Sequence, residues 1–121
     1  MCKELKNFKG VFMRDELNNR KSTDNECLIL NTDHSSGHGI HWISLFIKNG
    51  VAYYFNSYGN EPLDEVKEYC RGNIRYYSTD RIQQNDKVMG LCGYYCIYML
   101  WRLSNGYKFY DILNELYRCN I

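Results

Sequence analysis

The chain has 121 residues, and its 15 basic and 14 acidic side chains leave a formal net charge of +1. This length predicts one domain over residues 1–121, large enough to bury a hydrophobic core. The near-neutral charge gives no electrostatic basis for binding nucleic acid or a membrane surface. The 16% aromatic content and the single proline exclude a disordered chain.

The amino-terminal residues are charged and contain no apolar segment of the kind found in secretory signals. We therefore expect a protein that is not secreted. Its six cysteines follow no regular spacing, which favours reduced thiols in a cytosolic setting over a disulfide framework.

The first third of the chain predicts one buried strand between polar loops. Residues 8–17 mix apolar and charged side chains, which indicates a short helix or a turn. Residues 18–25 are polar and predict a loop. The apolar run at 27–31 predicts a buried strand, and the stretch rich in Gly and Ser at 32–40 predicts a second loop.

A β-hairpin is predicted next. Two strand-like runs, 41–47 and 51–56, are joined by a turn that contains an Asn-Gly pair, the strongest short-range hairpin signal. The hairpin places His41 near the start of one strand and Asn56 near the end of its partner. Both side chains are therefore expected at the same edge of the sheet, at closely paired positions.

The second half of the chain predicts mainly helices. Residues 62–70 begin with a proline and carry apolar residues at helical spacing, which predicts an amphipathic helix. Residues 73–77 predict another strand, and residues 81–90 a loop. Residues 107–117 predict a final helix, whose apolar face would consist of Phe109, Ile112, Leu113 and Leu116.

Residues 94–103 predict a helix that is apolar all round and therefore buried in the middle of the domain. The segment is too short to cross a bilayer, which takes about 20 apolar residues. Cys92 stands just before it, close to Gly90 and Gly93. A helix N-terminus favours negative charge, so a thiol there can form the nucleophilic thiolate. The alternative is that Cys92 is a small buried hydrophobe in the core.

Three residues together match the requirements of a cysteine peptidase. Cys92 is a candidate nucleophile, His41 a candidate base, and Asn56 a candidate side chain to orient the imidazole. The side-chain amide of Gln83 or Gln84, together with backbone N–H groups at the helix start, could hold the oxyanion.

A zinc site is the competing interpretation of some of the same residues. His34, His38 and His41 are spaced H-x3-H-x2-H, and Cys92 and Cys96 lie four residues apart, spacings that resemble those of zinc ligands. The histidines fall in a loop of Gly and Ser, however, and Cys96 would lie inside the buried helix. We therefore expect no metal site.

Five segments of the chain resemble, in the same order, the adenain-type (adenovirus-type) cysteine proteases and their relatives in polinton-type transposons, virophages and large DNA viruses. The wider clan includes the ubiquitin-like-protein proteases. The segments are CLILNT at 27–32, GIHW at 39–42, YFNSYG at 54–59, QQ at 83–84 and CGYYC at 92–96. The resemblance implies an α+β fold with a central mixed β-sheet, packed against a buried helix that carries the nucleophile at its N-terminus.

The resemblance also implies roles for individual residues. His41 matches the catalytic histidine and Cys92 the nucleophile, whereas Asn56 stands where most members have Asp or Glu. Gln84 is closer than Gln83 to the spacing of the oxyanion-hole glutamine, and Gln83 is the alternative. Trp42 matches the aromatic residue that follows the histidine, and is expected to wall the substrate cleft.

The function implied is that of a cysteine endopeptidase that matures viral capsid or core precursor proteins at small-residue Gly-X sites. The expected location is the host-cell cytoplasm or virus factory and the virion. No cofactor is expected, although family analogy makes an activating peptide or DNA a candidate partner. The alternatives are an isopeptidase of ubiquitin-like tags and a non-enzymatic interaction domain that keeps the fold.

Overall fold

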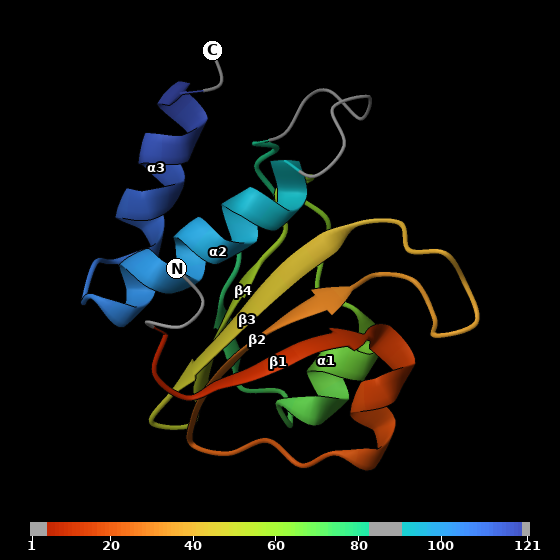
Figure 1. The fold of residues 1–121 in the computed structure, drawn as a ribbon. Coiled ribbons are helices and arrows are strands. Elements are labelled where there is room, and N and C mark those ends of the chain that lie inside the picture. Colours follow the sequence, from red (N-terminus) through yellow and green to blue (C-terminus); the bar gives the residue numbers. More distant parts are fainter. Residues whose placement is uncertain (1–4, 83–90, 120–121) are drawn as a thin grey trace.

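The computed structural model describes residues 5–82 and 91–119 (Figure 1). Within these residues the fold is α+β, with a five-stranded mixed sheet whose strand order follows the chain, β1-β2-β3-β4-β5. The strands are β1 (Phe8–Met13), β2 (Asn25–Asn31), β3 (Trp42–Lys48), β4 (Val51–Phe55) and β5 (Ile74–Tyr76). The helices are the 3-10 helix η2 (Arg14–Asn19) and the α-helices α1 (Asp64–Tyr69), α2 (Leu91–Ser104) and α3 (Phe109–Cys119).

The middle of the sheet is antiparallel and its two outer pairs are parallel. Strands β2, β3 and β4 pair antiparallel, whereas β1 runs parallel to β2 and β4 parallel to β5. A parallel pair requires a crossover connection. Helix η2 lies in the first crossover and α1 in the second, and the two helices pack against each other on one face of the sheet. Helices α2 and α3 lie on the other face (Figure 1).

The predicted hairpin is confirmed. Asn49 and Gly50 both have positive φ, 53° and 77°, as the two central residues of a type I′ turn require. The turn sets the register of β3 against β4, in which Lys48 pairs with Val51 and Ser44 with Phe55.

Alternation along the strands separates two cores. On the face of α1 and η2 lie aliphatic residues such as Leu28, Leu30 and Ile43. On the face of α2 and α3 lie Cys27 and Phe55, with partly buried aromatic residues packed around them. The sheet is therefore covered on both faces, and most of the partly buried aromatic residues lie on the side of α2 and α3.

The prediction of a short helix or a turn for residues 8–17 was wrong for residues 8–13, which form strand β1, whereas residues 14–17 begin the 3-10 helix η2. Strand β1 lies at the edge of the sheet and is held by hydrogen bonds to β2, in a register that shifts between Phe8 and Val11. The sequence of β1 shows only weak alternation of apolar and polar residues, and Gly10 interrupts the strand with a φ of 128°. Pairing with β2, a tertiary interaction, decides its conformation.

The other predicted elements lie close to their observed places. Helix α1 falls within 62–70, strand β5 within 73–77, and α3 overlaps 107–117. Residues 83–90, which make up most of the predicted loop at 81–90, lie outside the described residues. Among the helices that are described, none is long and apolar enough to cross a membrane.

Helix α2 is not buried all round, contrary to the prediction. Its buried residues are Cys92, Cys96, Met99, Leu100 and Leu103, which share one helical face and pack on the sheet. The opposite face is aromatic, and Tyr94 there is 73% exposed. A tyrosine side chain is amphipathic enough to remain partly in water. The apolar and aromatic residues on every side of the helix therefore led to an overestimate of its burial.

Candidate active site

His41 and Asn56 meet at the edge of the sheet where β3 begins and β4 ends. Both side chains are buried, with 3% and 6% of their surface exposed. His41 Nε2 lies 2.8 Å from Asn56 Oδ1. The backbone carbonyl of His41 accepts a hydrogen bond from the Thr32 N–H at 2.8 Å, which fixes the main chain at this point. The structure thus brings together the two residues that the hairpin predicted to be neighbours.

A second contact of Asn56 determines the tautomer of the histidine. The backbone N–H of Tyr58 donates to Asn56 Oδ1 at 2.9 Å. An amide NH2 group cannot accept this bond, so the atom facing both partners is the oxygen. Nε2 of His41 must then carry the proton that it shares with Oδ1. Nδ1 is left as the basic nitrogen of the ring, which is the arrangement a general base needs.

Tyr58 is a further residue of the site that the sequence did not single out. Its ring stacks on the His41 imidazole, with centroids 3.9 Å apart and planes 15° apart. The guanidinium of Arg81 lies 5.4 Å from the centroid of the same tyrosine ring. The hairpin register could have identified Tyr58. Ser44 pairs with Phe55, and the same register, continued past the strands, sets His41 opposite Tyr58.

The loop before His41 is held in place by a buried asparagine. Asn31, at the end of β2, is 2% exposed. Its Oδ1 accepts hydrogen bonds from the backbone N–H groups of Asp33 at 2.8 Å and Ile40 at 3.0 Å. The side chain therefore ties the two ends of the loop together and defines how the chain enters the site.

Cys92 is the second residue of α2 and is 8% exposed. A Cβ placed on the next residue, Gly93, would lie 3.8 Å from Cδ1 of Trp42, so the indole lies against the backbone of the first helical turn. Trp42 directly follows His41 and is half-buried. Helix α2 accordingly starts over the end of the sheet at which β3 begins (Figure 1).

Two of the other buried thiols, Cys96 and Cys70, have environments that oppose ionisation. Burial raises the pKa of Cys96 well above its usual value, and the neighbouring Cys92 adds to this, while a hydrogen bond with Ser44 acts in the opposite direction. Burial, followed by the charge of Glu26, raises the pKa of Cys70 to about 12. Neither side chain is suited to supply a thiolate near neutral pH.

The remaining predicted residues fall into two groups. Gln83 and Gln84, the candidate oxyanion donors, lie outside the described residues. His34 and His38 are exposed on the loop that precedes His41. In the described part of the chain, no group of three or more His, Cys, Asp or Glu side chains is placed to hold a metal ion. The zinc interpretation therefore lacks the ligand cluster that it requires there.

Comparison with known proteins shows a likeness in fold. No family model and no curated protein matches the sequence. A solved structure of the ASFV pS273R protease is similar, with a TM-score of 0.56 and 16% identity over 94% of this chain and 58% of that one. Its Se-Met form covers 83% of this chain and 44% of its own, at 21% identity and a TM-score of 0.49.

This chain therefore spans roughly half the length of the ASFV pS273R protease. At 16% identity the similarity establishes a shared fold. The narrower resemblance to adenain-type proteases stays a prediction.

Proposed function

We propose that this chain is a cysteine endopeptidase of the ubiquitin-like-protease clan, with Cys92 as nucleophile, His41 as base and Asn56 as the residue that orients the base. The observation that carries the proposal is the buried contact of 2.8 Å between His41 Nε2 and Asn56 Oδ1, at the end of the sheet over which α2 begins, with Cys92 as its second residue. The fold shared with the ASFV pS273R protease supports it.

The proposed reaction is acyl transfer to the thiol. Nδ1 of His41 takes the proton of Cys92, and the thiolate attacks the carbonyl carbon of the scissile peptide. The oxyanion is held by the side chain of Gln84, or Gln83, and by backbone N–H groups near Cys92. The imidazolium gives its proton to the leaving amine, and a water molecule, deprotonated by His41, then hydrolyses the thioester and regenerates the thiol.

An asparagine is chemically sufficient as the third member. The thiolate and the imidazolium form an ion pair, so a carboxylate is not required to balance the charge on the ring. Asn56 accepts from Nε2–H and keeps the tautomer. The face of Tyr58, stacked on the ring, provides electron density that favours the cationic imidazolium. Two neutral side chains thus orient the imidazole and stabilise its cationic form.

The biological setting proposed is the maturation of viral capsid or core precursors at Gly-X sites, by a single protease domain that acts in the host-cell cytoplasm or virus factory and in the virion. A peptide or DNA activator is part of this proposal by family analogy. The ASFV pS273R protease is longer than this chain, so these assignments go beyond the shared fold.

A peptidyl vinyl sulfone that ends in glycine tests the proposed chemistry. We expect covalent labelling at Cys92, located by mass spectrometry of the digested protein, and no labelling of Cys92→Ala. Cys96→Ala, altered one turn further along the same helix, is the matched control and should be labelled at the wild-type rate. His41→Gln should slow the labelling by about 10³-fold, because the base is lost.

The result also separates the alternatives. Absence of labelling in the folded wild-type protein would favour an interaction domain that keeps the fold. A ubiquitin-like protein carrying the same electrophile, if it reacted faster than the short peptide, would favour an isopeptidase. Cleavage of a capsid precursor that persisted in Cys92→Ala would contradict the assignment of the nucleophile.

A further inference from the structure

A groove opens at the end of the sheet opposite His41. It consists of two hollows, of about 210 and 350 Å³, whose shared lining includes Phe46, Lys48 and Leu103. We call this surface the distal groove. Trp42 and Lys48 are the two ends of β3, so at about 3.3 Å per residue the groove lies some 20 Å from the candidate active site.

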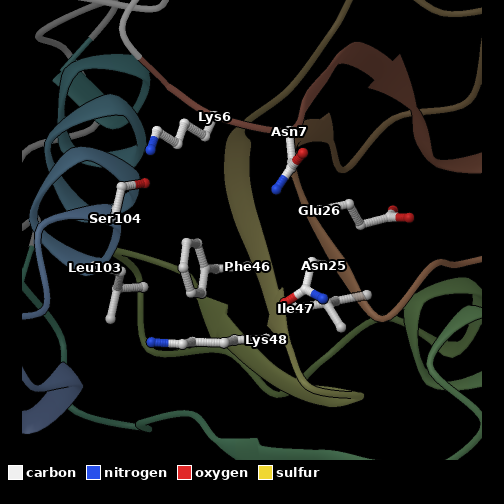
Figure 2. Close-up of a pocket in the computed structure, with 9 residues that line it drawn as sticks. All are labelled: Lys6, Asn7, Asn25, Glu26, Phe46, Ile47, Lys48, Leu103 and Ser104. Atoms are coloured by element: carbon white, nitrogen blue, oxygen red, sulfur yellow. The ribbon is translucent and has the colours of Figure 1, made fainter.

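The smaller hollow is basic. Figure 2 shows Lys6 and Lys48 extending in the same direction, on either side of the Phe46 ring, toward the end of α2. Glu26, the acidic residue of this hollow, points the opposite way. Its carboxylate accepts hydrogen bonds from the Tyr69 hydroxyl and, at 2.6 Å, from the Thr23 N–H. Glu26 therefore does not neutralise the two lysines of this hollow.

The larger hollow is aromatic. Tyr53 and Tyr76 stack in parallel at 4.3 Å, and Phe109 meets Tyr110 edge to face at 5.3 Å. Tyr110 is 50% exposed, and Tyr107 beside it is 54% exposed. A concave apolar space of this size lies within the range of about 300–1,000 Å³ typical of binding pockets, and exposed tyrosines are enriched at interfaces.

Charged residues frame the aromatic hollow unevenly. Lys48 and Lys108 are exposed at its lining, and Asp111 is the acidic residue there. With Lys6 in the adjoining hollow, the groove carries a row of cations beside an apolar pocket. A ligand that complements it has one large apolar group flanked by negative charges.

We propose that the distal groove docks an extended acidic peptide segment with one aromatic anchor, carried by the protein that the enzyme cleaves. The anchor enters the aromatic hollow, and carboxylates on either side pair with Lys48, Lys108 and Lys6. The identification of the partner as a substrate rests on the proposed protease function. The recognition itself rests on the shape and charge of the groove.

Single-stranded nucleic acid fits the groove less well. A nucleic-acid backbone carries a negative charge at every nucleotide, so it would also meet Asp111 and the negative C-terminal end of α2 at Ser104, whereas a peptide can carry its carboxylates only opposite the lysines. Tyr53 and Tyr76 stack on each other, so one face of each ring is already covered. The hollow therefore suits a single aromatic anchor better than a run of stacked bases. An acidic peptide meets the same lysines without requiring continuous contact along a charged strand.

Docking at this distance would act on substrate capture. A segment held in the groove raises the local concentration of the attached cleavage site. The KM of a substrate that carries the acidic segment should therefore be lower than the KM of the same site without it, while kcat stays the same.

The test uses the full chain as Cys92→Ala and a fluorescent decapeptide with a central tryptophan among aspartates. Fluorescence anisotropy should show binding that weakens with salt. Replacing the tryptophan with alanine should weaken it about tenfold, as should Lys48→Glu or Tyr110→Ala in the protein. Lys67→Glu, an exposed lysine of α1 on the other face of the sheet, is the matched control and should bind normally.

Three results would overturn the proposal: no binding of the acidic peptide, tighter binding of an oligothymidine or of the lysine-containing counterpart, or binding unchanged in Lys48→Glu and Tyr110→Ala. Thermal unfolding of each variant establishes that it is folded. Failure of the proposed function can be distinguished from failure of the docking proposal, because labelling of Cys92 by a short electrophile without the acidic segment does not involve the groove. That rate should be equal in wild type and Lys48→Glu.

Discussion

The two faces of the sheet differ in what their side chains do. The core on the face of α1 and η2 is mainly aliphatic, and the hollow between these two helices is small, about 170 Å³, so we call this the closed face and the opposite one the open face. Polar contacts of the closed face include internal pairs. Arg14 and Glu65 form two hydrogen bonds, at 2.8 and 2.6 Å, and Tyr69 donates to Glu26. The face of α2 and α3 carries the thiols of Cys27, Cys92 and Cys96, partly buried aromatic rings and open hollows. The first face contributes mainly packing, whereas the second carries the candidate nucleophile Cys92 and the distal groove.

The topology explains this division. Both parallel pairs of strands need a crossover, and η2 and α1 place both crossovers on the same face. That face is thereby closed with short local segments. The opposite face remains available for α2 and α3, which come later in the chain and leave the distal groove where α2 ends and α3 begins.

The largest expected effect on stability comes from breaking the closed face. Leu28 is fully buried there. Leu28→Ala should lower the free energy of unfolding by about 2–5 kcal/mol, because it removes packed methyl groups and leaves a cavity. Urea unfolding measures the loss. Val11→Ala, at a residue that is 55% exposed on β1, is the control and should change stability by less than about 0.5 kcal/mol. Equal losses in the two variants would contradict the comparison.

Asn56→Ala tests the orienting residue of the open face. We expect the rate of Cys92 labelling to fall by about 10²-fold, less than in Cys92→Ala, because orientation is lost and the nucleophile remains. Asn56→Asp restores an acceptor for Nε2–H and should recover most of the rate. It should also move the basic limb of the pH–rate profile to higher pH, since a carboxylate favours the imidazolium. A rate in Asn56→Ala equal to wild type would mean that the contact with His41 is structural.

Tyr58→Leu tests the stacked ring and should have a smaller effect. Losing the aromatic face removes about 1 kcal/mol of stabilisation from the imidazolium. We expect the labelling rate to fall severalfold, and the basic limb of the pH–rate profile to move to lower pH. Tyr58→Phe keeps the ring and should behave as wild type. A purely structural role would lower the unfolding temperature in Tyr58→Leu without moving the pH profile.

The smallest effect is expected at the ion pair of the closed face. The hydrogen bond from Arg14 holds the pKa of Glu65 below its ordinary value, against a smaller opposing effect of burial. Because the folded-state pKa is the lower one, this stabilisation is complete above the ordinary carboxylate range and is lost as pH falls through the folded-state value. Glu65→Gln should therefore cost about 1 kcal/mol at pH 7 and less at pH 3. Urea unfolding at both values checks this, and the labelling rate of Cys92 should not change.

The proximity of the candidate residues His41 and Asn56 was predictable because local rules apply there. The Asn49-Gly50 turn alone sets the register of the hairpin, and that register brings His41 to Asn56. Tyr58 could have been found by continuing the same register past the strands. The run of apolar residues located the helix that contains Cys92. The predicted oxyanion donors Gln83 and Gln84 lie outside the described residues.

Helix and hairpin positions follow from short-range rules, since capping, turn geometry and spacing are contained in a few neighbouring residues. Tertiary packing decided the rest. β1 became a strand because β2 offers it a partner, and α2 exposes Tyr94 because the sheet covers only one side of the helix. The stack of Tyr58 on His41 and the groove between Phe46 and Tyr110 also depend on contacts between segments that are separate in the chain. No local pattern records which face of an element another element will cover.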